Sequence, residues 1–349
     1  MTMPWISIII PFYNRKKLVL ETIESILRQT FEQYEVLLID DHSNEDVTFS
    51  IQNQVKNDPR FKILRRKSSV KGAPQCRNEG IKEASGEYLM FLDSDDLMSP
   101  TCLEKRMKCA RENKDYDFLV FNVALFNSGT RYCDYLFSNL NTLDDLDGFI
   151  KYTGGWHTSS TIFNRNFLIE NHLNFDNDAL SWQDVEFHIR VILKSKNYRK
   201  FPLSIPDIFI RLHGENRISD SKWSYEKLFS RIKIYQKIQQ LIATETDREY
   251  KTEFLKLYFF FLHIAGRKLK KREFLKILNF WYTHYKFKNY RTFILKKYLK
   301  ILNFFSRIHF PFLGAIIYQI PKIILRNKLK YPQKKVKLNN PINLNNFFY

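Results

Sequence analysis

The chain has 349 residues, of which 44% are hydrophobic, and a formal net charge of +19. This hydrophobic content is enough for a sizeable core and excludes disorder of the whole chain. Residues 1–220 carry 28 basic and 31 acidic side chains, whereas residues 221–349 carry 28 basic and only 6 acidic ones. The excess charge therefore belongs to the C-terminal part, which argues against a uniformly basic nucleic-acid-binding protein.

The four cysteines show neither a CxxC pair nor the spacing of a zinc site. They therefore predict reduced thiols in a reducing compartment. The apolar start Met3–Ile10 lacks the basic flank and cleavage site of a signal peptide, and no apolar stretch is long enough to span a membrane as a plain helix. The sequence predicts a cytoplasmic protein.

The first 95 residues alternate short apolar runs with amphipathic helical patterns. Strands are expected at Trp5–Pro11, Glu35–Ile39, Phe61–Leu64 and Tyr88–Leu92, and helices at residues 18–27 and Ala73–Ala84. This alternation is typical of βαβ units around a parallel sheet, so the predicted fold class is α/β.

The pattern changes in the rest of the chain. Further strands are expected near Phe118–Leu125, Ser160–Phe163 and Ser204–Leu212, and a helix from Ser181. Beyond Ser221 the pattern is almost wholly helical, and the tail Lys330–Tyr349 looks like low-complexity disorder. The sequence therefore predicts a first domain over residues 1–220 and a basic, helical C-terminal region over residues 221–349.

Polar residues gather directly after three predicted strands, at Asn14–Arg15, Asp40–Asp41 and Asp93–Asp96. In open parallel sheets ligands bind outside the carboxyl ends of the strands, so this edge is suited to a nucleotide. The chain has no GxGxxG after the first strand and no GxxxxGK[ST] motif. A dinucleotide-binding or P-loop site is therefore not supported.

The acids Asp93, Asp95 and Asp96 lie within four residues of one another after an apolar strand. Such crowding is repulsive unless a cation relieves it, and hard divalent cations prefer carboxylate oxygens. The alternative is a solvated turn at a helix start, but Ser99 and Pro100 are expected to cap the next helix. The segment therefore favours metal binding.

Five segments, in order and spacing, resemble family 2 glycosyltransferases with the GT-A fold. They read IIIPFYNR at 8–15, SILRQT at 25–30, LIDDHS at 38–43, RNEG at 77–80 and YLMFLDSDD at 88–96. The resemblance is strong over residues 5–100 and traceable to about residue 220. It implies a Rossmann-like nucleotide-diphospho-sugar transferase domain that transfers a hexose with inversion. The cofactor that the resemblance implies is Mn²⁺ or Mg²⁺.

The resemblance also implies roles for the strand-end residues. Asp93-Ser94-Asp95 would be the DXD motif, with Asp95 holding Mn²⁺ or Mg²⁺ on the donor diphosphate and Asp93 near the ribose. Asp41 would accept the N–H of a uracil-type base. From local sequence alone, an Asx turn leading to a Ser43 cap is the preferred interpretation of Asp40–Asp41, and the resemblance reverses this preference.

Four further residues complete the donor site that the resemblance implies. Pro11, Tyr13 and Arg15 would line the base and phosphate positions, and Arg77 would help to close the nucleotide pocket.

Asp184 is the candidate general base. It lies off the apolar stripe of its predicted helix, and the resemblance places it at the aspartate of the family's Glu-Asp motif. Gln183 replaces the usual glutamate, which leaves the role of that neighbouring position in doubt. The alternative is structural, because Ser181 and Asp184 have the spacing of a capping box.

Three other residues are candidates for contacts around the site. The resemblance suggests that His213 completes the metal site, although a loop histidine can also be simply solvated. Trp156 and Trp182 could stack on a donor or acceptor sugar, and a core position is the alternative for Trp156.

The predicted reaction is transfer from a nucleotide-sugar, expected to be a UDP-sugar, to an acceptor hydroxyl in cell-surface polysaccharide or glycan assembly, with a glycan or lipid-linked acceptor. The alternative is a non-catalytic module of the same fold, or a membrane scaffold. A complete acid cluster, base and nucleotide pocket favour the enzyme.

Residues 286–337 interleave Lys and Arg with aromatic and aliphatic residues. Such a segment can lie on an anionic membrane, pack with a solvated basic face, or bind single-stranded nucleic acid. The apolar segment Ile301–Leu325 is interrupted by Arg307, Pro311 and Pro321, which favours an interfacial position. We therefore expect a peripheral protein at the inner face of the cell membrane, without a nucleic-acid partner.

Overall fold

The computed structural model describes residues 4–56, 58–151, 153–212, 223–248, 250–284 and 336–348. The chain divides into two compact units. Unit 1 comprises Met1–Gly214 and Pro332–Tyr349, and unit 2 comprises Glu215–Tyr331. The last residues of the chain therefore belong to the same unit as its first 214.

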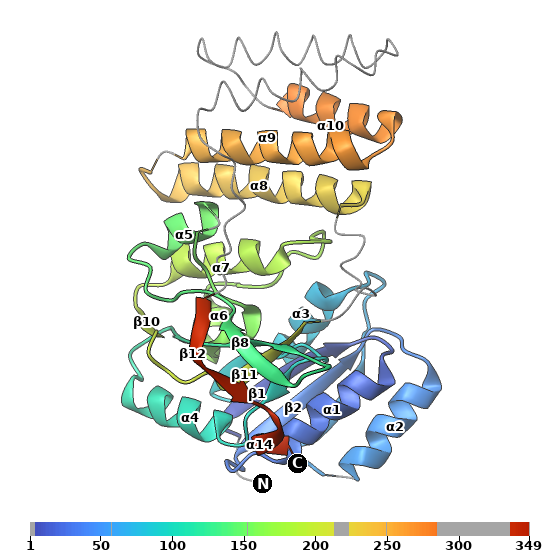
Figure 1. Cartoon of the computed structure of the whole chain (residues 1–349), viewed down its shortest axis with the longest axis vertical. Coiled ribbons are helices and arrows are strands. Elements are labelled where there is room, and N and C mark those ends of the chain that lie inside the picture. Colours follow the sequence, from blue (N-terminus) through green and yellow to red (C-terminus); the bar gives the residue numbers. More distant parts are fainter. Residues whose placement is uncertain are drawn as a thin grey trace. The chain divides into compact units, whose positions relative to one another are not determined.

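Unit 1 is built on a seven-stranded sheet with the order β10-β6-β9-β4-β1-β2-β3 (Figure 1). The strands are β1 (Ile6–Phe12), β2 (Tyr34–Asp40), β3 (Phe61–Arg65), β4 (Tyr88–Phe91), β6 (Phe118–Phe121), β9 (Thr161–Asn164) and β10 (Tyr198–Phe201). Strands β1 to β4 are parallel, and β9 runs antiparallel to β4 and β6. The predicted α/β fold with a parallel sheet is confirmed.

Helices cover both faces of this sheet. They are α1 (Lys16–Leu27), α2 (Glu45–Val55), α3 (Ala73–Glu83), α4 (Cys102–Glu112), α5 (Asp145–Lys151), α6 (Arg165–Glu170) and α7 (Gln183–Lys194). Ile8 and Ile10 of β1 belong to the main core with residues of α1 and α2. Ile9 faces α3, where a Cβ on Gly80 would lie 2.3 Å from Ile9 Cγ2. Burial on both faces explains why β1 reads as a continuous apolar run.

A second, five-stranded sheet has the order β12-β8-β7-β11-β5. Its strands are β5 (Leu97–Met98), β7 (Ala124–Asn127), β8 (Tyr132–Leu136), β11 (Ile208–Leu212) and β12 (Val336–Asn343), followed by α14 (Asn345–Phe348). It has a smaller core of its own, which includes Leu97, Phe126, Phe209 and Leu344.

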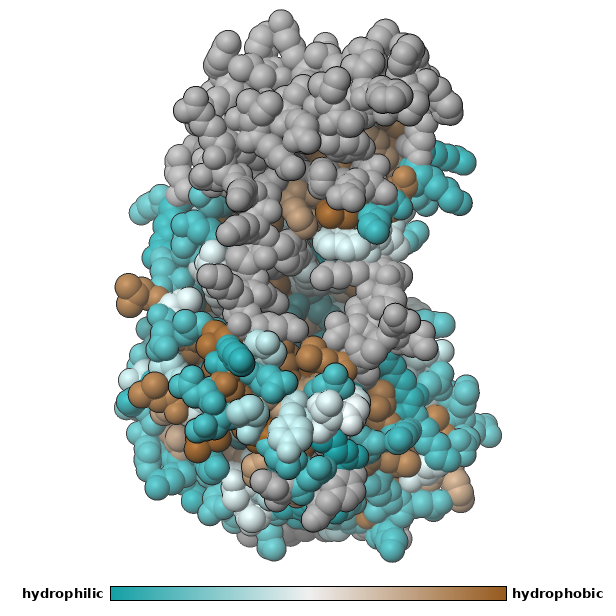
Figure 2. Space-filling model, in the orientation of Figure 1, coloured by the Kyte–Doolittle hydropathy of each residue, from teal (hydrophilic) through white to brown (hydrophobic). Residues whose placement is uncertain are grey.

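On the face of unit 1 drawn in Figure 2, hydrophilic residues predominate and hydrophobic ones are scattered.

The structure corrects three of the predicted elements. The apolar run Phe118–Leu125 forms β6 and β7, which belong to different sheets. The chain changes sheets at Asn122, whose side-chain amide donates to the carbonyls of Pro202 and Ser204. The strand expected at Ser204–Leu212 begins only at Ile208, and the disorder expected for the tail is wrong for residues 336–348, which form β12 and α14.

The described part of unit 2 is helical, as predicted, and comprises α8 (Tyr225–Glu245), α9 (Lys251–Lys268) and α10 (Lys271–His284). Leu228, Ile232 and Tyr235 of α8 are buried, and so is Phe261 of α9. Most of the basic and aromatic segment 286–337 lies outside the described residues. Within the described helices, none combines the length and apolar character that crossing a membrane requires.

Candidate functional site

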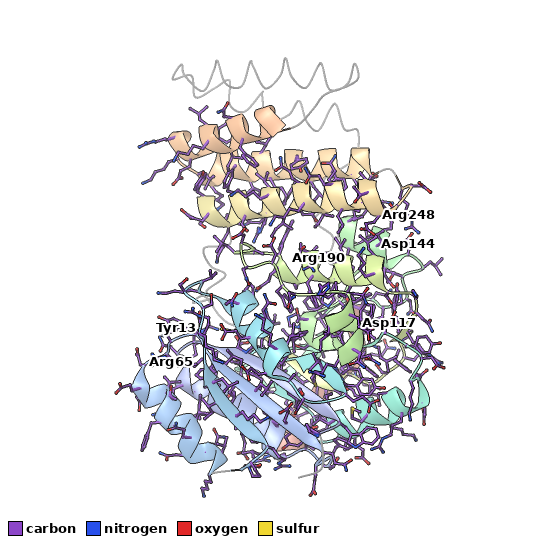
Figure 3. All side chains as sticks on the ribbon, turned by 180° about the vertical axis from the view of Figure 1, so that it is seen from behind. Tyr13, Arg65, Asp117, Asp144, Arg190 and Arg248 are labelled. Atoms are coloured by element: carbon purple, nitrogen blue, oxygen red, sulfur yellow. The ribbon has the colours of Figure 1, made fainter. Side chains whose placement is uncertain are left out.

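The loops after β1 and β2 are tied together at the carboxyl edge of the large sheet. The backbone N–H of Asn14 donates to Ser43 Oγ at 2.8 Å, and that of Asn44 donates to Asn14 Oδ1 at 2.9 Å. Asn14 and Arg15 both adopt positive φ angles, of 52° and 53°, and Arg15 is the N-cap of α1. Figure 3 labels Tyr13, directly after β1, and Arg65, the last residue of β3, at this edge.

The acid loop, defined as residues 93–96 between β4 and β5, meets two arginines there. Arg15 Nη1 lies 3.0 Å from Asp95 Oδ2, and Arg77 Nη2 lies 2.5 Å from Asp93 Oδ1. The predicted residues Arg15, Arg77, Asp93 and Asp95 are thus brought together from α1, α3 and one loop. The basic groups offset the repulsion expected among the acids.

Asp96 is the most deeply placed of the three acids, with only 2% of its surface exposed. Its Oδ1 accepts from the backbone N–H of Arg211 at 3.0 Å, and Arg211 Nε donates to the Asp95 carbonyl at 2.7 Å. Burial, together with the charges of Asp95 and Asp93, raises the pKa of Asp96 well above its usual range. Burial opposes ionisation of Asp93 as well, but Arg77 and His157 outweigh it and the pKa of Asp93 is lowered.

Several buried atoms at this edge lack a partner among the described residues. Arg77 is 4% exposed, yet its Nε and Nη1 have no hydrogen-bond partner there, and neither has Asp96 Oδ2. Buried polar groups are costly unless they are satisfied. Since Arg77 presents unsatisfied donors and Asp96 an unsatisfied acceptor, this edge is suited to an anion and a cation bound together.

Three side chains at this edge could bind a divalent cation. Asp93, Asp96 and His157 offer one ligand atom each, and these atoms lie within 4.8 Å of one another. Two carboxylates and an imidazole are suitable ligands for Mn²⁺, and carboxylates for Mg²⁺. This set differs from the predicted pair: Asp95 is engaged by Arg15, and His213 lies outside the described residues.

Asp41 and Asp40 have different partners. Asp40 Oδ1 accepts from the backbone N–H of Ser43 at 2.7 Å, so Asp40 makes the turn that the structural alternative described. Asp41 Oδ1 pairs with Arg66 Nε, and Asp41 Oδ2 accepts from the backbone N–H of Gly72 at 3.0 Å. Asp41 is therefore fixed at the end of β2 by groups from the segment between β3 and α3.

Asp184 lies in the first turn of α7. The N-cap is Trp182, at a φ of 63°, whereas the capping-box alternative places Ser181 at that position. Phe187 of the next turn packs on Phe91 of β4 with ring centroids 6.0 Å apart. Phe91 lies two residues before Asp93, so this packing fixes the start of α7 against the strand that leads into the acid loop.

A buried histidine supports this helix turn. His188 Nδ1 lies 2.8 Å from the Asp184 carbonyl, and burial lowers the pKa of His188 to about 3. The imidazole is therefore neutral, and Nδ1 carries the proton that it donates to the carbonyl. Its ring stacks near Phe149, with centroids 5.7 Å apart.

The remaining predicted residues vary in exposure. Pro11 is buried in β1, Tyr13 is 52% exposed, and Ser94 and Trp182 are half-buried. Trp156 is buried and packs edge-on against Phe149, with ring centroids 4.9 Å apart. Its burial agrees with a core position, which was the alternative for Trp156, and leaves little of the indole ring accessible to a sugar.

Sequence reasoning missed Arg66 and gave neither Asp96 nor His157 an individual role in metal binding. Arg66 directly follows β3, so the rule that polar residues after parallel strands line the ligand edge would have found it. Asp96 was recognised within the acid cluster but received no role. His157 follows Trp156 in a glycine-containing loop, and no local pattern indicates that the loop brings it within 3.8 Å of Asp93.

Comparison with known proteins identifies this architecture. Residues 7–169 match the family model of glycosyl transferase family 2. The chain is 31% identical over 198 residues to the poly(ribitol-phosphate) beta-N-acetylglucosaminyltransferase TarP of Staphylococcus aureus, covering 55% of this chain and 59% of TarP. It is 31% identical over 195 residues to a poly(ribitol-phosphate) beta-glucosyltransferase of Bacillus spizizenii, covering 30% of that protein. The chain thus spans less than two thirds of either relative.

Solved structures agree on the fold. The crystal structure of S. aureus TarS 1–349 in complex with UDP-GlcNAc superposes with a TM-score of 0.62 at 17% identity, covering 96% of this chain and 99% of TarS 1–349. A mannosyltransferase from Pyrobaculum calidifontis, solved with GDP-Man and Mn²⁺, gives a TM-score of 0.50 at 14% identity, covering 93% of this chain and 87% of the mannosyltransferase chain. The predicted GT-A fold is confirmed, and residues 7–169 form a domain of glycosyl transferase family 2.

Proposed function

We propose that this protein is an inverting, metal-dependent glycosyltransferase that moves a sugar from a UDP-sugar to a hydroxyl of a cell-surface polymer. The observation that carries the proposal is the carboxyl edge of the large sheet, where buried Arg77 atoms and Asp96 Oδ2 have no partner among the described residues. A nucleoside diphosphate with a divalent cation supplies the anion and cation that these atoms lack. The names of the relatives support a sugar as the transferred group.

The donor is held by residues from three strand ends. Asp41, fixed by Arg66 and Gly72, accepts the N–H of the uracil ring, and Pro11 and Tyr13 lie at the adjoining end of β1. Arg15 and Arg77 offset charge on the departing diphosphate, which stabilises the transition state electrostatically. Asp93, Asp96 and His157, with Asp95 beside them, would hold a divalent cation. The bound cation would act as a Lewis acid toward the diphosphate.

Asp184 is the proposed general base. Its carboxylate lies in the first turn of α7, which Phe187 and His188 fix against the core. Asp184 accepts the proton of the acceptor hydroxyl as the oxygen attacks the anomeric carbon and the diphosphate leaves. A single displacement inverts the configuration, so an α-linked donor yields a β-linked product.

Measuring UDP release tests this assignment. UDP-sugars should be assayed with Mn²⁺ and poly(ribitol phosphate), using wild type, Asp184→Asn, Asp95→Ala and the control Asp134→Asn, which changes an exposed acid of β8. We expect acceptor-dependent UDP release by wild type and by Asp134→Asn, and strongly reduced release by the other two. Undiminished turnover in Asp184→Asn or Asp95→Ala would remove that residue from the mechanism.

The basic C-terminal region is proposed to hold the enzyme at an anionic surface on the inner face of the cell membrane. The support is its charge, since residues 274–349 contain no acidic residue. Sedimentation with vesicles of phosphatidylcholine alone or with anionic phosphatidylglycerol, at low and high salt, tests this. Binding only to anionic vesicles at low salt supports the proposal. Binding to poly(ribitol phosphate) or RNA but not to vesicles would reassign the region to a polyanion.

A further inference from the structure

The C-terminal segment 336–348 completes the small sheet of unit 1. Strand β12 pairs antiparallel with β8 at its edge, and Figure 1 shows the two side by side. The backbone N–H of Leu344 donates to the Arg131 carbonyl at 3.0 Å, and Asn343 Nδ2 lies 3.2 Å from the Tyr132 hydroxyl. The segment is therefore attached to a part of the fold that lies about 200 positions earlier in the sequence.

Two of its side chains enter the core under this sheet. Leu344 is 1% exposed and belongs to the small core with Leu97 and Phe209. Phe347 packs on Phe209, with ring centroids 5.8 Å apart. The segment thus buries apolar surface of β5 and β11, in addition to pairing with β8.

Strands β5 and β11 are also the strands that fix the acid loop. Leu97 directly follows Asp96 and pairs with Phe209 in the sheet. Two residues after Phe209, Arg211 donates its backbone N–H to Asp96 Oδ1 and its Nε to the Asp95 carbonyl. Arg211 Nη2 also lies 2.7 Å from Glu21 Oε2 of α1. Phe209, on which Phe347 packs, and Arg211, which holds the acids, therefore lie two positions apart on the same face of β11, where Arg211 also approaches Phe126 of the small core.

We propose that segment 336–348 is a positioning element of the donor site, with Leu344 and Phe347 as positioning residues that act through Phe209 and Arg211 on the acid loop. The proposal rests on the proposed function for the statement that the acid loop binds the donor. Packed cores transmit the loss of side-chain volume to their neighbours. Removing either side chain lets β11 shift, and Arg211 then no longer holds Asp95 and Asp96 in the geometry that binds the diphosphate and its cation.

Segment 336–348 follows unit 2 in the chain. Unit 2 is joined to unit 1 after β11 and before β12, and both strands belong to the small sheet. The two covalent connections of unit 2 therefore lead into the sheet that carries Arg211.

Amide hydrogen exchange tests the proposal without any ligand. Full-length Leu344→Ala and Phe347→Ala are compared with Val55→Ala, which truncates a buried residue of the main core at the end of α2. The milder Phe347→Leu is included in case a larger truncation prevents folding. We expect exchange at residues 94–98 and 209–212 to be about tenfold faster in the first two variants, and unchanged in Val55→Ala at a similar loss of thermal stability.

Affinity for UDP with Mn²⁺, measured by calorimetry well below the melting temperature of every variant, gives the second readout. Leu344→Ala and Phe347→Ala should bind about tenfold more weakly, whereas Val55→Ala should bind as wild type does. Exchange at residues 94–98 that matches Val55→Ala would overturn the positioning role. Failure of wild type to bind UDP with Mn²⁺ would instead overturn the proposed function, and the exchange data would still decide whether the segment positions the acid loop.

Discussion

The large sheet carries two buried charge clusters, and they differ in how completely they are satisfied. Near the amino ends of β1 and β2, Glu35 Oε1 accepts from Ser7 Oγ at 2.6 Å and from the backbone N–H of Ser85 at 2.6 Å, and Oε2 lies 2.8 Å from Lys62 Nζ. At the carboxyl ends, Arg77 and Asp96 retain buried atoms without a partner in the described structure.

The difference separates a structural charge from a functional one. The buried Glu35 carboxylate, with hydrogen bonds to both oxygens, stabilises the fold and leaves no atom without a partner. A buried arginine with two unsatisfied nitrogens destabilises the folded protein, and an anion that accepts hydrogen bonds from these nitrogens removes that cost. Burial of charge alone therefore does not identify the site; the carboxyl edge is distinguished because unsatisfied atoms of a buried arginine and of a buried aspartate occur there together.

Replacing the proposed base is expected to have the largest effect on catalysis. Asp184→Asn keeps the size of the side chain but removes its capacity to accept a proton, so kcat should fall about 10²- to 10⁴-fold. The affinity for UDP should remain that of wild type, because Asp184 does not belong to the diphosphate site. Steady-state kinetics with calorimetric UDP binding measure both, and a parallel loss of affinity would contradict the role.

Arg77→Leu tests the unsatisfied cluster directly. Loss of the guanidinium should weaken UDP binding about 10- to 100-fold, because charge-assisted bonds to a phosphate are strong. Arg77→Lys should recover part of the affinity, since it restores the charge but not the second donor. Arg199→Leu, an exposed arginine of β10, is the control and should bind as wild type does.

Glu35→Gln tests the satisfied cluster and should show the opposite pattern. The amide cannot accept the same set of hydrogen bonds, so the free energy of unfolding at pH 7 should fall by about 2 kcal/mol. UDP affinity per folded molecule should stay constant. Denaturant unfolding with calorimetry of the folded fraction measures both, and weakened UDP binding would mean that the two clusters are not independent.

The stability of the Glu35 cluster should also depend on pH. Burial opposes ionisation of Glu35, but bonds from Lys62, Ser7 and Ser85 outweigh it, so the pKa of Glu35 in the folded state is lowered. Because the unfolded chain then binds the proton more tightly, this stabilisation is present above the ordinary glutamate pKa of about 4.5 and is lost as the pH falls below it.

His188 should affect stability only below its ordinary pKa, so its effect is visible in stability against pH. Its pKa is about 3 in the folded protein and 6.5 in the unfolded reference, so the unfolded state binds more protons between these values. Stability should be complete above about pH 6.5 and fall below it by about 1.4 kcal/mol per pH unit. His188→Phe should remove this slope in unfolding experiments between pH 6.5 and 5, and an unchanged slope would mean that the imidazole is not buried neutral.

Local sequence patterns predict the first part of the fold well, since β1 and β2 are short, mostly apolar runs and α1 carries an apolar stripe. The break between β6 and β7 is not evident from local sequence, because Asn122 is a single polar residue in an otherwise apolar run and is anchored by a carbonyl 80 positions away. Strand β12 is also hidden, because Lys337, Asn340 and Pro341 are atypical of a strand and pairing with β8 is what orders them.

The site residues also divide into those that local sequence indicates and those that depend on long-range contacts. Asp93, Asp95 and Arg15 follow their strands directly and could be placed at the ligand edge from sequence. The approach of His157 to Asp93 depends on how the loop before β9 folds back, and the pairing of Arg66 with Asp41 depends on the register of β3 beside β2. Such long-range contacts leave no periodic signal in a single sequence.

The most direct test of the central claim is calorimetric titration of the protein with UDP, in the presence of Mn²⁺ and then of EDTA, for wild type, Asp96→Asn and Glu35→Gln. If the unsatisfied carboxyl edge is the donor site, wild type and Glu35→Gln should bind UDP with Mn²⁺ alike, whereas EDTA or Asp96→Asn should weaken binding at least about tenfold. UDP binding that neither EDTA nor Asp96→Asn changes would contradict the account.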